Sequence, residues 1–483
     1  MTLLTLINTN RMHPPIAPIG LDYIASAVRD TGIAVDGIDL CLADDAESEL
    51  DRYFAAQRPE LVGLTFRNVD DCFWSSCQSF VPRFLDDVAA VRRRTDAPIV
   101  LGGVGYSLFP RRLLECSGAD FGIHGDGERA LIQLLDQIKG GRCWELVDGL
   151  LFWREGQVVA NPPAWPRQIS VPARRALVDN PTYFRLGGQI GVETKRGCRR
   201  RCLYCADPVA KGRSYRCRPP DEVADEFAYL LASGVDVIHL CDAEFNLPMD
   251  HAQQVCEALI ARGLGRSMRW YAYMAVTPLP RSLVRRMRQA GCVGINFTSD
   301  SAHPTMLANY NHRHRRRDLE HAVLACRQNG ISVMLDMLLG GPGETPETVA
   351  ETIKAFKEID PDCAGAALGL RIYPGTPLAS LLQAQGLLET NPHVRRPGFG
   401  PVDLLQPAYY LSRHLGDRPS RLVRELIGDD PRFFPPEDPL EQAVSAQTAD
   451  HNYSHNKGLV DAIAAGCRGA FWSILRDGGQ VKR

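Results

Sequence analysis

The chain has 483 residues, 45% of them hydrophobic, which allows a large buried core and roughly two to four domains. Its 55 lysines and arginines nearly balance 57 aspartates and glutamates, a formal net charge of −2, so charge gives no reason to expect nucleic acid or an anionic membrane as a partner. We expect neither a signal peptide nor a membrane span. The spacing of the 15 cysteines does not reveal a disulfide framework. The cysteines therefore favour a reduced, cytoplasmic protein with metal or redox chemistry.

The first third of the chain alternates short apolar strands with helices. Strands are predicted at 3–8, 35–40, 60–66, 98–103 and 120–125, and helices at 18–32, 80–94 and 126–138. This alternation predicts an α/β domain with a doubly wound parallel sheet over residues 1–145. Such sheets bind ligands in the loops at the carboxyl ends of their strands. Residues 146–185 then predict a hairpin and a proline-rich connector.

A second alternating series covers residues 186–385. Its predicted strands are 189–194, 235–242, 269–274, 293–298, 332–340 and 365–374, with helices between them such as 221–234 and 281–291. Six such units predict a partial (β/α)6 barrel. The remaining residues, 386–483, predict a small mixed, mainly helical region that caps the substrate site, with a final helix over 456–477.

Three closely spaced cysteines follow the first strand of this second series. Cys198, Cys202 and Cys205 stand in GCRRRCLYC, with no fourth cysteine in the loop. A structural zinc site usually takes four protein ligands. Three thiolates instead suit a 4Fe–4S cluster that leaves one iron open for a substrate or cofactor. The alternative is three buried or loop cysteines without a metal.

The segment GCRRRCLYC after QIGVETKR resembles the cluster loop of the radical S-adenosylmethionine (SAM) enzymes. The resemblance extends over residues 186–385. It implies that Cys198, Cys202 and Cys205 hold the cluster and that the amino and carboxylate groups of SAM chelate the fourth iron. Because an electron from the cluster normally cleaves SAM in that family, the resemblance also implies an electron donor such as flavodoxin or ferredoxin.

Further segments resemble the SAM-binding motifs of that family in the expected order. They are CDAEFN (241–246), FTSDS (297–301) and GGPGETPET (340–348). With the aromatic residue before the third cysteine, they imply SAM contacts at Tyr204, Glu244, Ser299, Asp300, Gly340 and Gly341. Glycines do let a backbone approach a ligand, and polar groups at strand ends collect at barrel sites. Taken singly, each residue also fits a turn or a helix cap.

The N-terminal domain resembles the cobalamin-binding domain that precedes many radical SAM domains. The resemblance rests on 14–26, 61–71, 100–110 and 123–131, and it implies cobalamin contacts at Gly102, Gly103, Gly127 and Glu128. The chain lacks the Asp-x-His-x-x-Gly loop whose histidine binds cobalt. Instead FRNVDD resembles the loop of the tryptophan 2-C-methyltransferase type, in which an arginine lies below cobalt, and Arg67 matches it. The alternative is a surface or salt-bridged arginine.

Other features allow two interpretations each. Cys72 and Cys77 could bind a soft ion such as arsenite, or they are small buried side chains. Arg371, in RIYPGTPL, could meet a carboxylate. The basic run 312–321 is expected to be a solvated helix start rather than a nucleic-acid site. Three aromatic residues near the C-terminus either cap a substrate pocket or belong to the core: Tyr453, Phe471 and Trp472.

Together, these resemblances imply a cobalamin-dependent radical SAM enzyme that transfers an alkyl group from SAM to a small molecule. The favoured reaction is methylation of an unactivated carbon in natural-product or lipid biosynthesis. One alternative transfers the 3-amino-3-carboxypropyl part of SAM to an acceptor such as arsenite, as in arsinothricin biosynthesis. The other is a non-catalytic cobalamin or iron–sulfur sensor. No motif identifies the acceptor or the catalytic residues that act on it.

Overall fold

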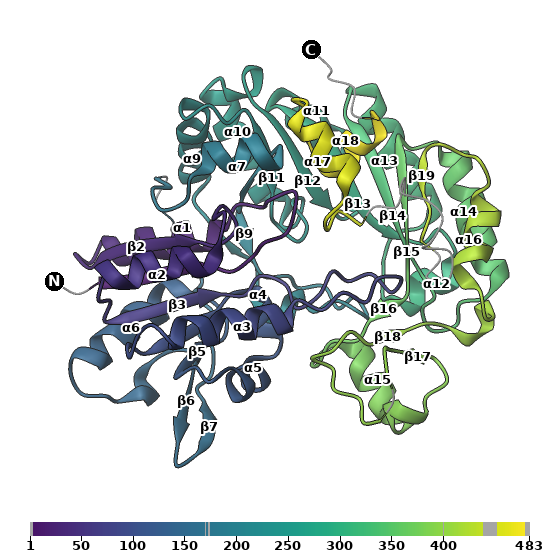
Figure 1. The fold of residues 1–483 in the computed structure, drawn as a ribbon. Coiled ribbons are helices and arrows are strands. Elements are labelled where there is room, and N and C mark those ends of the chain that lie inside the picture. The colour runs from purple at the N-terminus through teal and green to yellow at the C-terminus, as the bar shows by residue number, and fades with distance from the viewer. Residues whose placement is uncertain (1–2, 170, 172–173, 399, 438–451, 479–483) are drawn as a thin grey trace.

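Two large, mainly parallel β-sheets, each built from a different part of the chain, organise the structure (Figure 1). The computed structural model describes residues 3–169, 171, 174–398, 400–437 and 452–478. Helices lie on both sides of the first sheet and on the outside of the second. The expected α/β class, with a doubly wound sheet followed by a partial barrel, is confirmed.

The first sheet has the strand order β2-β1-β3-β4-β5-β6-β7. Its strands are β1 (Leu3–Asn8), β2 (Ala34–Asp39), β3 (Leu61–Thr65), β4 (Ile99–Gly102), β5 (Phe121–Ile123), β6 (Leu150–Arg154) and β7 (Gln157–Ala160). The first five are parallel, and the predicted hairpin, β6–β7, extends the sheet antiparallel to β5. The chain passes from β1 to β2 on one side and then to β3 on the other. This reversal of strand order opens a ligand crevice at the carboxyl ends of β1 and β3.

Helices cover both faces of the first sheet, which explains why its central strands are largely apolar. Its helices are α1 (Ile19–Arg29), α2 (Ala46–Ala56), α3 (Val81–Arg92), α4 (Val104–Leu108), α5 (Pro110–Ser117) and α6 (Gly127–Lys139). The helices α1 and α6 pack together over one hydrophobic cluster, and α2, α3 and α5 pack over another. A strand buried on both faces needs apolar residues at consecutive positions, and β3 buries four of its five residues.

The second sheet is a partial barrel with the strand order β19-β15-β14-β13-β12-β11-β8, all parallel. Its strands are β8 (Ile190–Val192), β11 (Val237–Leu240), β12 (Arg269–Met274), β13 (Cys292–Asp300), β14 (Ser332–Leu339), β15 (Cys363–Leu368) and β19 (Phe433–Phe434). Six of these strands were predicted, and the short edge strand β19 was not. Its helices are α8 (Asp207–Lys211), α9 (Pro220–Ala232), α10 (Met249–Ala261), α11 (Arg281–Gln289), α12 (Pro304–Asn309), α13 (Arg316–Gln328), α14 (Pro346–Ile359) and α16 (Pro419–Ile427).

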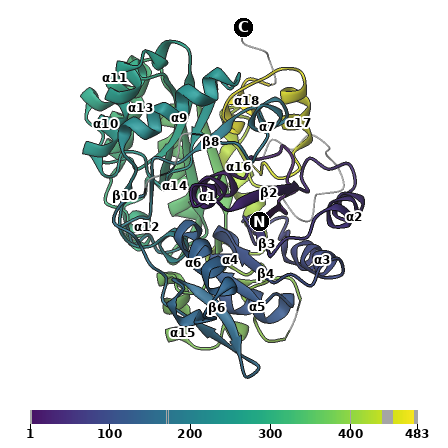
Figure 2. The same cartoon turned by 90° about the vertical axis from the view of Figure 1, so that its left-hand side faces the viewer.

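The last part of the chain returns to the start of the barrel. A small antiparallel sheet joins β16 (Leu370–Arg371), β17 (Val394–Arg395) and β18 (Tyr409–Tyr410) beside α15 (Pro377–Gln385). The single helix predicted over 456–477 is in fact two helices, α17 (Lys457–Ala464) and α18 (Phe471–Arg476), because glycines 466 and 469 interrupt it. In Figure 2, α17 lies beside α7 (Asn180–Gly187) of the connector, with which it is in contact. None of the described helices combines the length and apolar composition that crossing a bilayer requires.

Buried ion pairs join the first sheet to the barrel. Arg175 of the connector donates to Asp22 of α1 at 3.1 Å and lies 3.5 Å from Glu226 of α9. Glu226 also accepts from Arg218 at 2.6 Å. All four side chains are fully buried, so removing one partner would leave an uncompensated charge at a cost of about 3–5 kcal/mol. This network holds the two sheets in one arrangement.

Candidate active site

A large cavity lies where the carboxyl ends of the two sheets face each other. It encloses about 2550 Å³ of space outside protein atoms, its open mouth included. Strand ends and loops of both sheets line it, among them Asn8, Thr65, Arg67, Gly102, Gly191, His239, Cys241 and Tyr273. Both open α/β sheets and barrels carry their sites at this edge. The position indicates a ligand site shared by the two halves of the chain.

Glycines line the floor of the cavity on the side of the first sheet. A Cβ on Gly102 would meet no atom within 4 Å, whereas one on Gly103 would lie 2.6 Å from the Phe66 carbonyl oxygen. Gly102 therefore leaves space for a ligand that any other residue would fill, and Gly103 is required by the turn itself. Gly127, at the start of α6, also lines the cavity. This floor fits a large, flat group such as a corrin ring.

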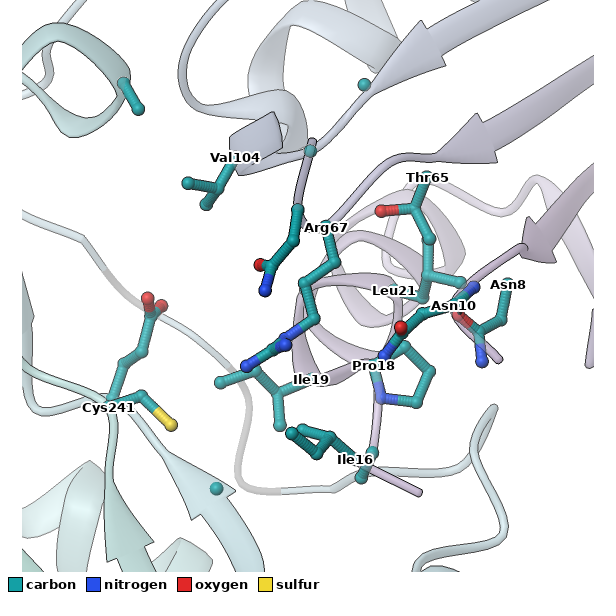
Figure 3. Close-up of a pocket in the computed structure, with 18 of the residues that line it drawn as sticks. Asn8, Asn10, Ile16, Pro18, Ile19, Leu21, Thr65, Arg67, Val104 and Cys241 are labelled. Atoms are coloured by element: carbon teal, nitrogen blue, oxygen red, sulfur yellow. Dashed lines mark hydrogen bonds between the residues drawn. The ribbon is translucent and has the colours of Figure 1, made fainter. Parts of the chain in front are cut away.

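Arg67 extends from the loop after β3 toward Cys241 at the end of β11 (Figure 3). It lines the cavity, and no carboxylate of the described residues forms an ion pair with it. Burial lowers the pKa of its guanidinium, which Cys241 and Tyr273 counteract. No described histidine of the first domain lines the cavity. The cavity thus presents a cation, and no imidazole, on the side of the first sheet.

The cysteine loop follows β9 (Lys195–Arg196), which pairs with β10 (Arg216–Cys217). Gly197 has a φ of +80°, and a Cβ there would lie 2.2 Å from the Ser214 carbonyl oxygen, so only glycine fits. The Cys198 N–H donates to the Gly212 carbonyl at 3.2 Å, and the Leu203 N–H donates to the Tyr310 carbonyl at 3.1 Å. Neighbouring loops therefore hold this loop from both sides.

The three thiols of the loop lie partly or fully out of solvent. Cys198 and Cys202 are buried and Cys205 is half-buried. Within the described residues, no three His, Cys, Asp or Glu side chains come close enough to share one metal ion. A zinc ion needs its ligands to converge on one point, whereas a cluster binds each cysteine through a different iron. The donor set fits a 4Fe–4S cluster better than zinc.

Glu244 lies near the cysteine loop with one acceptor free. Its Oε1 accepts from the Thr298 hydroxyl at 2.8 Å and lies 3.7 Å from Nη1 of Arg200. Its Oε2 is buried and has no hydrogen-bond partner in the described structure. Burial raises the pKa of this carboxyl to about 7, although Arg200 opposes the shift. An unsatisfied acceptor here fits an ammonium group, such as that of SAM.

Asp300, at the end of β13, links the cysteine loop to the barrel. It accepts a hydrogen bond from the Tyr204 hydroxyl and another from Nε2 of His312 at 2.5 Å. Since Arg200 donates to Nδ1 of His312 at 3.2 Å, His312 carries its proton on Nε2. Burial alone would raise the pKa of Asp300, but His312 and Tyr204 bring it below the usual value. Asp300 therefore remains a carboxylate that fixes Tyr204.

The other predicted SAM residues are engaged with the protein itself. The Ser299 hydroxyl donates to the Asp336 carbonyl at 2.7 Å and is fully buried. The Gly340 N–H donates to Glu344 at 3.0 Å, and the Gly341 N–H donates to the Tyr310 hydroxyl at 3.1 Å. Side chains at either glycine would collide with Leu411 or Tyr310. Their SAM contacts stay predictions.

Glu128, a predicted cobalamin contact, lines the cavity but is already paired. Both of its oxygens accept from Arg196, at 2.8 and 3.1 Å, and Arg196 also donates to Glu193 at 2.9 Å. Arg196 stands two residues before Cys198. Glu128 therefore connects the first domain to the cysteine loop, and its cobalamin contact stays a prediction.

The loop after Arg67 contacts the end of the barrel. Asp70 accepts from Arg371, the carboxylate contact foreseen for this arginine. Cys72 lies 3.1 Å from the Tyr373 hydroxyl, and the Cys77 thiol donates to the Trp74 carbonyl at 3.1 Å. Both thiols have protein partners, and no described cluster including them would hold a metal ion. The basic run at 312–321 does include a helix start, at Arg316 of α13. It is not solvated throughout, because His312 and His314 are buried.

Residues that the sequence analysis missed lie inside the barrel. His239, Tyr273, Asn296 and Asp336 come from four adjacent strands, and the first and second line the cavity. His239 and Asp336 each interrupt an apolar run, in VIHL and SVMLDMLL, and that interruption is a signal available in the sequence. At the C-terminal end, Tyr453, Phe471 and Trp472 line the cavity, and the latter two are also part of the core.

Comparisons with known proteins agree with this geometry. The model of the radical SAM superfamily matches residues 192–356, and the model of the B12 binding domain matches residues 7–135. The chain is 29% identical to tryptophan 2-C-methyltransferase of Streptomyces laurentii, covering 98% of this chain and 95% of that protein. The B12 binding domain corresponds to the half with the first sheet, and the radical SAM family corresponds to the half with the partial barrel.

Solved structures extend the similarity to three dimensions. TsrM from Kitasatospora setae, a radical SAM methyltransferase solved with tryptophan and a SAM analogue, is 31% identical with a TM-score of 0.92, covering 99% of this chain and 98% of that one. The structure of the same enzyme with cobalamin and a [4Fe–4S] cluster bound is 30% identical to this chain, with a TM-score of 0.90. That match covers 99% of this chain and 98% of the other. These relatives support neither aminocarboxypropyl transfer nor a sensor role. The chain belongs to the cobalamin-dependent radical SAM methyltransferases of the tryptophan 2-C-methyltransferase type, with a 4Fe–4S cluster, SAM and cobalamin as cofactors.

Proposed function

We propose that the protein transfers a methyl group from SAM to an unactivated carbon of a small aromatic acceptor of the tryptophan class, in natural-product biosynthesis. The observation that carries this proposal is a single cavity lined both by Arg67 and by Arg196, two residues before Cys198. A methyl donor, its carrier and an acceptor must open on one space to exchange a group. The relative solved with tryptophan supports the acceptor class.

The residues that would hold each cofactor follow from their positions around the cavity. We assign Cys198, Cys202 and Cys205 to the cluster, Tyr204, Glu244, Ser299, Asp300, Gly340 and Gly341 to the SAM site, and Arg67, Gly102, Gly103, Gly127 and Glu128 to the cobalamin site. When bound, the cluster supplies an open iron for SAM, and cobalamin supplies a carrier for the methyl group. We also propose units at 1–145, 146–185, 186–385 and 386–483.

The chain contributes placement, charge and exclusion of water. Arg67 places a permanent positive charge beside the cobalamin site and offers no nitrogen to bind cobalt, because a guanidinium stays protonated. Asp300 accepts from Tyr204 and so holds the cysteine loop against the end of β13. Burial lowers the pKa of His239 to about 4, so this residue is neutral near pH 7 and can accept a hydrogen bond at one ring nitrogen.

An exposed group of arginines surrounds the cysteine loop. Arg199, Arg201, Arg313 and Arg315 are exposed, and none of them forms an ion pair with a described residue. The two loops that carry them are joined, because the Asn311 side chain donates to the Arg201 carbonyl at 2.9 Å. We propose that an acidic one-electron donor, such as flavodoxin or ferredoxin, docks on these four arginines.

Anaerobic protein reconstituted with the cluster and cobalamin tests the proposed function. It is incubated with SAM carrying a deuterated methyl group, L-tryptophan and a reductant, and the products are analysed by mass spectrometry. The expected product is tryptophan carrying one deuterated methyl group on a ring carbon. Transfer of the aminocarboxypropyl group instead, or consumption of SAM with no change in any aromatic acceptor, would contradict the proposal.

A further inference from the structure

Two surfaces line the lumen of the barrel. One is apolar and is called the lumen floor below, and the other is a polar wall. Side chains on alternate strand positions face opposite sides of a sheet. Val333, Leu335 and Met337 of β14 pack in the large core cluster, so the residues between them face the lumen. Met334 packs with Tyr271 and Trp472 in a separate apolar cluster that forms the floor.

The polar wall lies above this floor. Tyr273 is paired in register with Asn296 on the neighbouring strand β13. Asp336 lies on β14, the strand on the other side of β13. The side chain of Asn296 lies close to both Tyr273 and Asp336. His239 forms an edge-on contact with the Tyr273 ring at 5.3 Å. The wall is continuous with the cavity, because His239 and Tyr273 line that cavity together with Trp472 of the floor.

Two acceptors in the wall have no donor. Oδ1 of Asn296 and Oδ1 of Asp336 are both buried and lack a hydrogen-bond partner among the described residues. Asn296 as a whole is only 2% exposed. Native proteins leave few buried polar atoms unsatisfied, and those that occur near a cavity point to a missing ligand or water. The missing group must donate hydrogen bonds, since both free atoms accept them.

The charged groups of the wall indicate that the missing hydrogen-bond donor is positively charged. No described lysine or arginine forms an ion pair with Asp336. Burial, with a smaller effect of the Asp300 carboxylate, raises the pKa of Asp336 to about 7, although the Asn296 side chain opposes the shift. His239 is uncharged, because burial lowers its pKa to about 4. A carboxylate without a cation in a dry site is complemented by a positively charged group.

We propose that Asp336 and Asn296 bind the protonated amine of the methyl acceptor, while its aromatic ring lies toward Trp472 on the lumen floor. The inference rests on the proposed function, which it deepens by requiring an acceptor with a cationic amine. The two residues are positioning residues for the acceptor and touch no reacting carbon. A substrate that lacks the amine leaves the two buried oxygen atoms, Oδ1 of Asn296 and Oδ1 of Asp336, without a hydrogen-bond donor. The site therefore binds such a substrate less tightly.

Binding and turnover are measured separately to test this inference. Anaerobic holoprotein with a non-transferable SAM analogue is titrated calorimetrically with three amines, namely tryptophan, tryptamine and phenethylamine, and with the des-amino partner of each. The wild-type protein is expected to bind at least one amine about tenfold more tightly than its partner. Asp336→Asn and Asn296→Leu are expected to remove that preference and to leave cluster and corrin absorption unchanged.

Asp44→Asn is the matched control, because Asp44 is exposed on the first domain, outside the cavity. It should keep the wild-type preference. Equal binding of every amine and its des-amino partner, or a preference that survives in Asp336→Asn, overturns the inference. If the preference is present but tryptophan is not methylated, the acceptor proposed above is wrong and the amine site stands.

Discussion

Arg371 of β16, just after the barrel strand β15, donates its Nε–H to Asp70 of the first domain at 2.7 Å, and both side chains are almost completely buried. The two residues are 301 positions apart. Asp70 belongs to the loop that starts at Arg67, so the pair holds the loop of the proposed cobalamin site against the end of the barrel. The Tyr373 ring lies beneath the Arg371 guanidinium at 4.7 Å and completes its surroundings.

Removing one partner of this pair should destabilise the protein. Asp70→Ala leaves the Arg371 charge buried and uncompensated, which costs about 3–5 kcal/mol. The free energy of unfolding can be measured by denaturant titration. Asp403→Ala breaks the exposed Arg112–Asp403 contact and should cost less than about 1 kcal/mol. Similar losses for the two variants would show that the buried pair does not hold the domains.

Each cysteine of the loop should be needed for the cluster alone. Cys198→Ala, Cys202→Ala and Cys205→Ala are expected to lose the iron–sulfur absorption of anaerobic preparations, because each thiolate binds a separate iron. Corrin absorption should persist, since the proposed cobalamin site lies on the first sheet. Cys143→Ala, at an exposed cysteine, serves as the control. Unchanged iron content in the triple variant, or zinc in its place, would refute the ligand assignment.

Replacing Arg67 should change the chemistry of cobalamin more than its binding. Arg67→Gln removes the charge and is expected to reduce methyl transfer by at least about tenfold with little loss of bound corrin. Arg67→His places a potential cobalt ligand in the same loop and is expected to shift the visible corrin spectrum. Arg266→Gln, at an exposed arginine, is the control. Loss of corrin from both Arg67 variants would instead assign Arg67 to binding.

Binding of a cationic acceptor should depend on pH through Asp336. The pKa of this carboxyl is raised to about 7 by burial, so protonation below that value removes the charge that attracts the amine. Affinity for the amine should therefore fall as pH decreases through about 7. Asp336→Asn should abolish the dependence. Calorimetric titrations across this range decide the matter, and an affinity that rises at low pH would be inconsistent with it.

The same pKa makes a prediction for stability. The pKa of Asp336 in the folded state lies above its value of about 3.9 in the unfolded state. The contribution of this carboxyl to the free energy of unfolding is therefore fully present below about pH 3.9, its unfolded pKa, and is lost as pH rises through about 7. Asp336→Asn should therefore stabilise the protein at pH values above about 7. Thermal unfolding at low and high pH measures the difference. A variant less stable than wild type under alkaline conditions would contradict the prediction.

The arginines around the cysteine loop should act on the electron donor only. Arg199→Gln combined with Arg313→Gln is expected to weaken activity supported by flavodoxin, and increasingly so at low salt, because charge steers association. Activity supported by dithionite should be unchanged. Arg58→Gln replaces an arginine of the first domain, outside both loops, as the control. Equal loss with both reductants would place the defect in the site rather than in docking.

Local signals in the chain were enough to predict most of the framework. The predicted strand over 3–8 coincides with β1, and the predicted strand over 269–274 coincides with β12. Strand identity follows from runs of apolar residues, which persist wherever both faces of a sheet are covered. The cysteine spacing and Gly197 are likewise local. Helix α2 was missed because it buries only Leu50 and Phe54, too few apolar residues to show a helical period.

The partners of the polar side chains depended on the tertiary structure. Glu128 pairs with Arg196 across 68 positions, and Asp336 faces the lumen because its neighbours on β14 pack outward. Nothing local specifies such partners, since they depend on which strands and loops become adjacent after the two sheets meet. The sequence alone therefore determined the family, the strands and the cysteine loop. Folding decided which carboxylates are paired and which remain free, because only burial separates them.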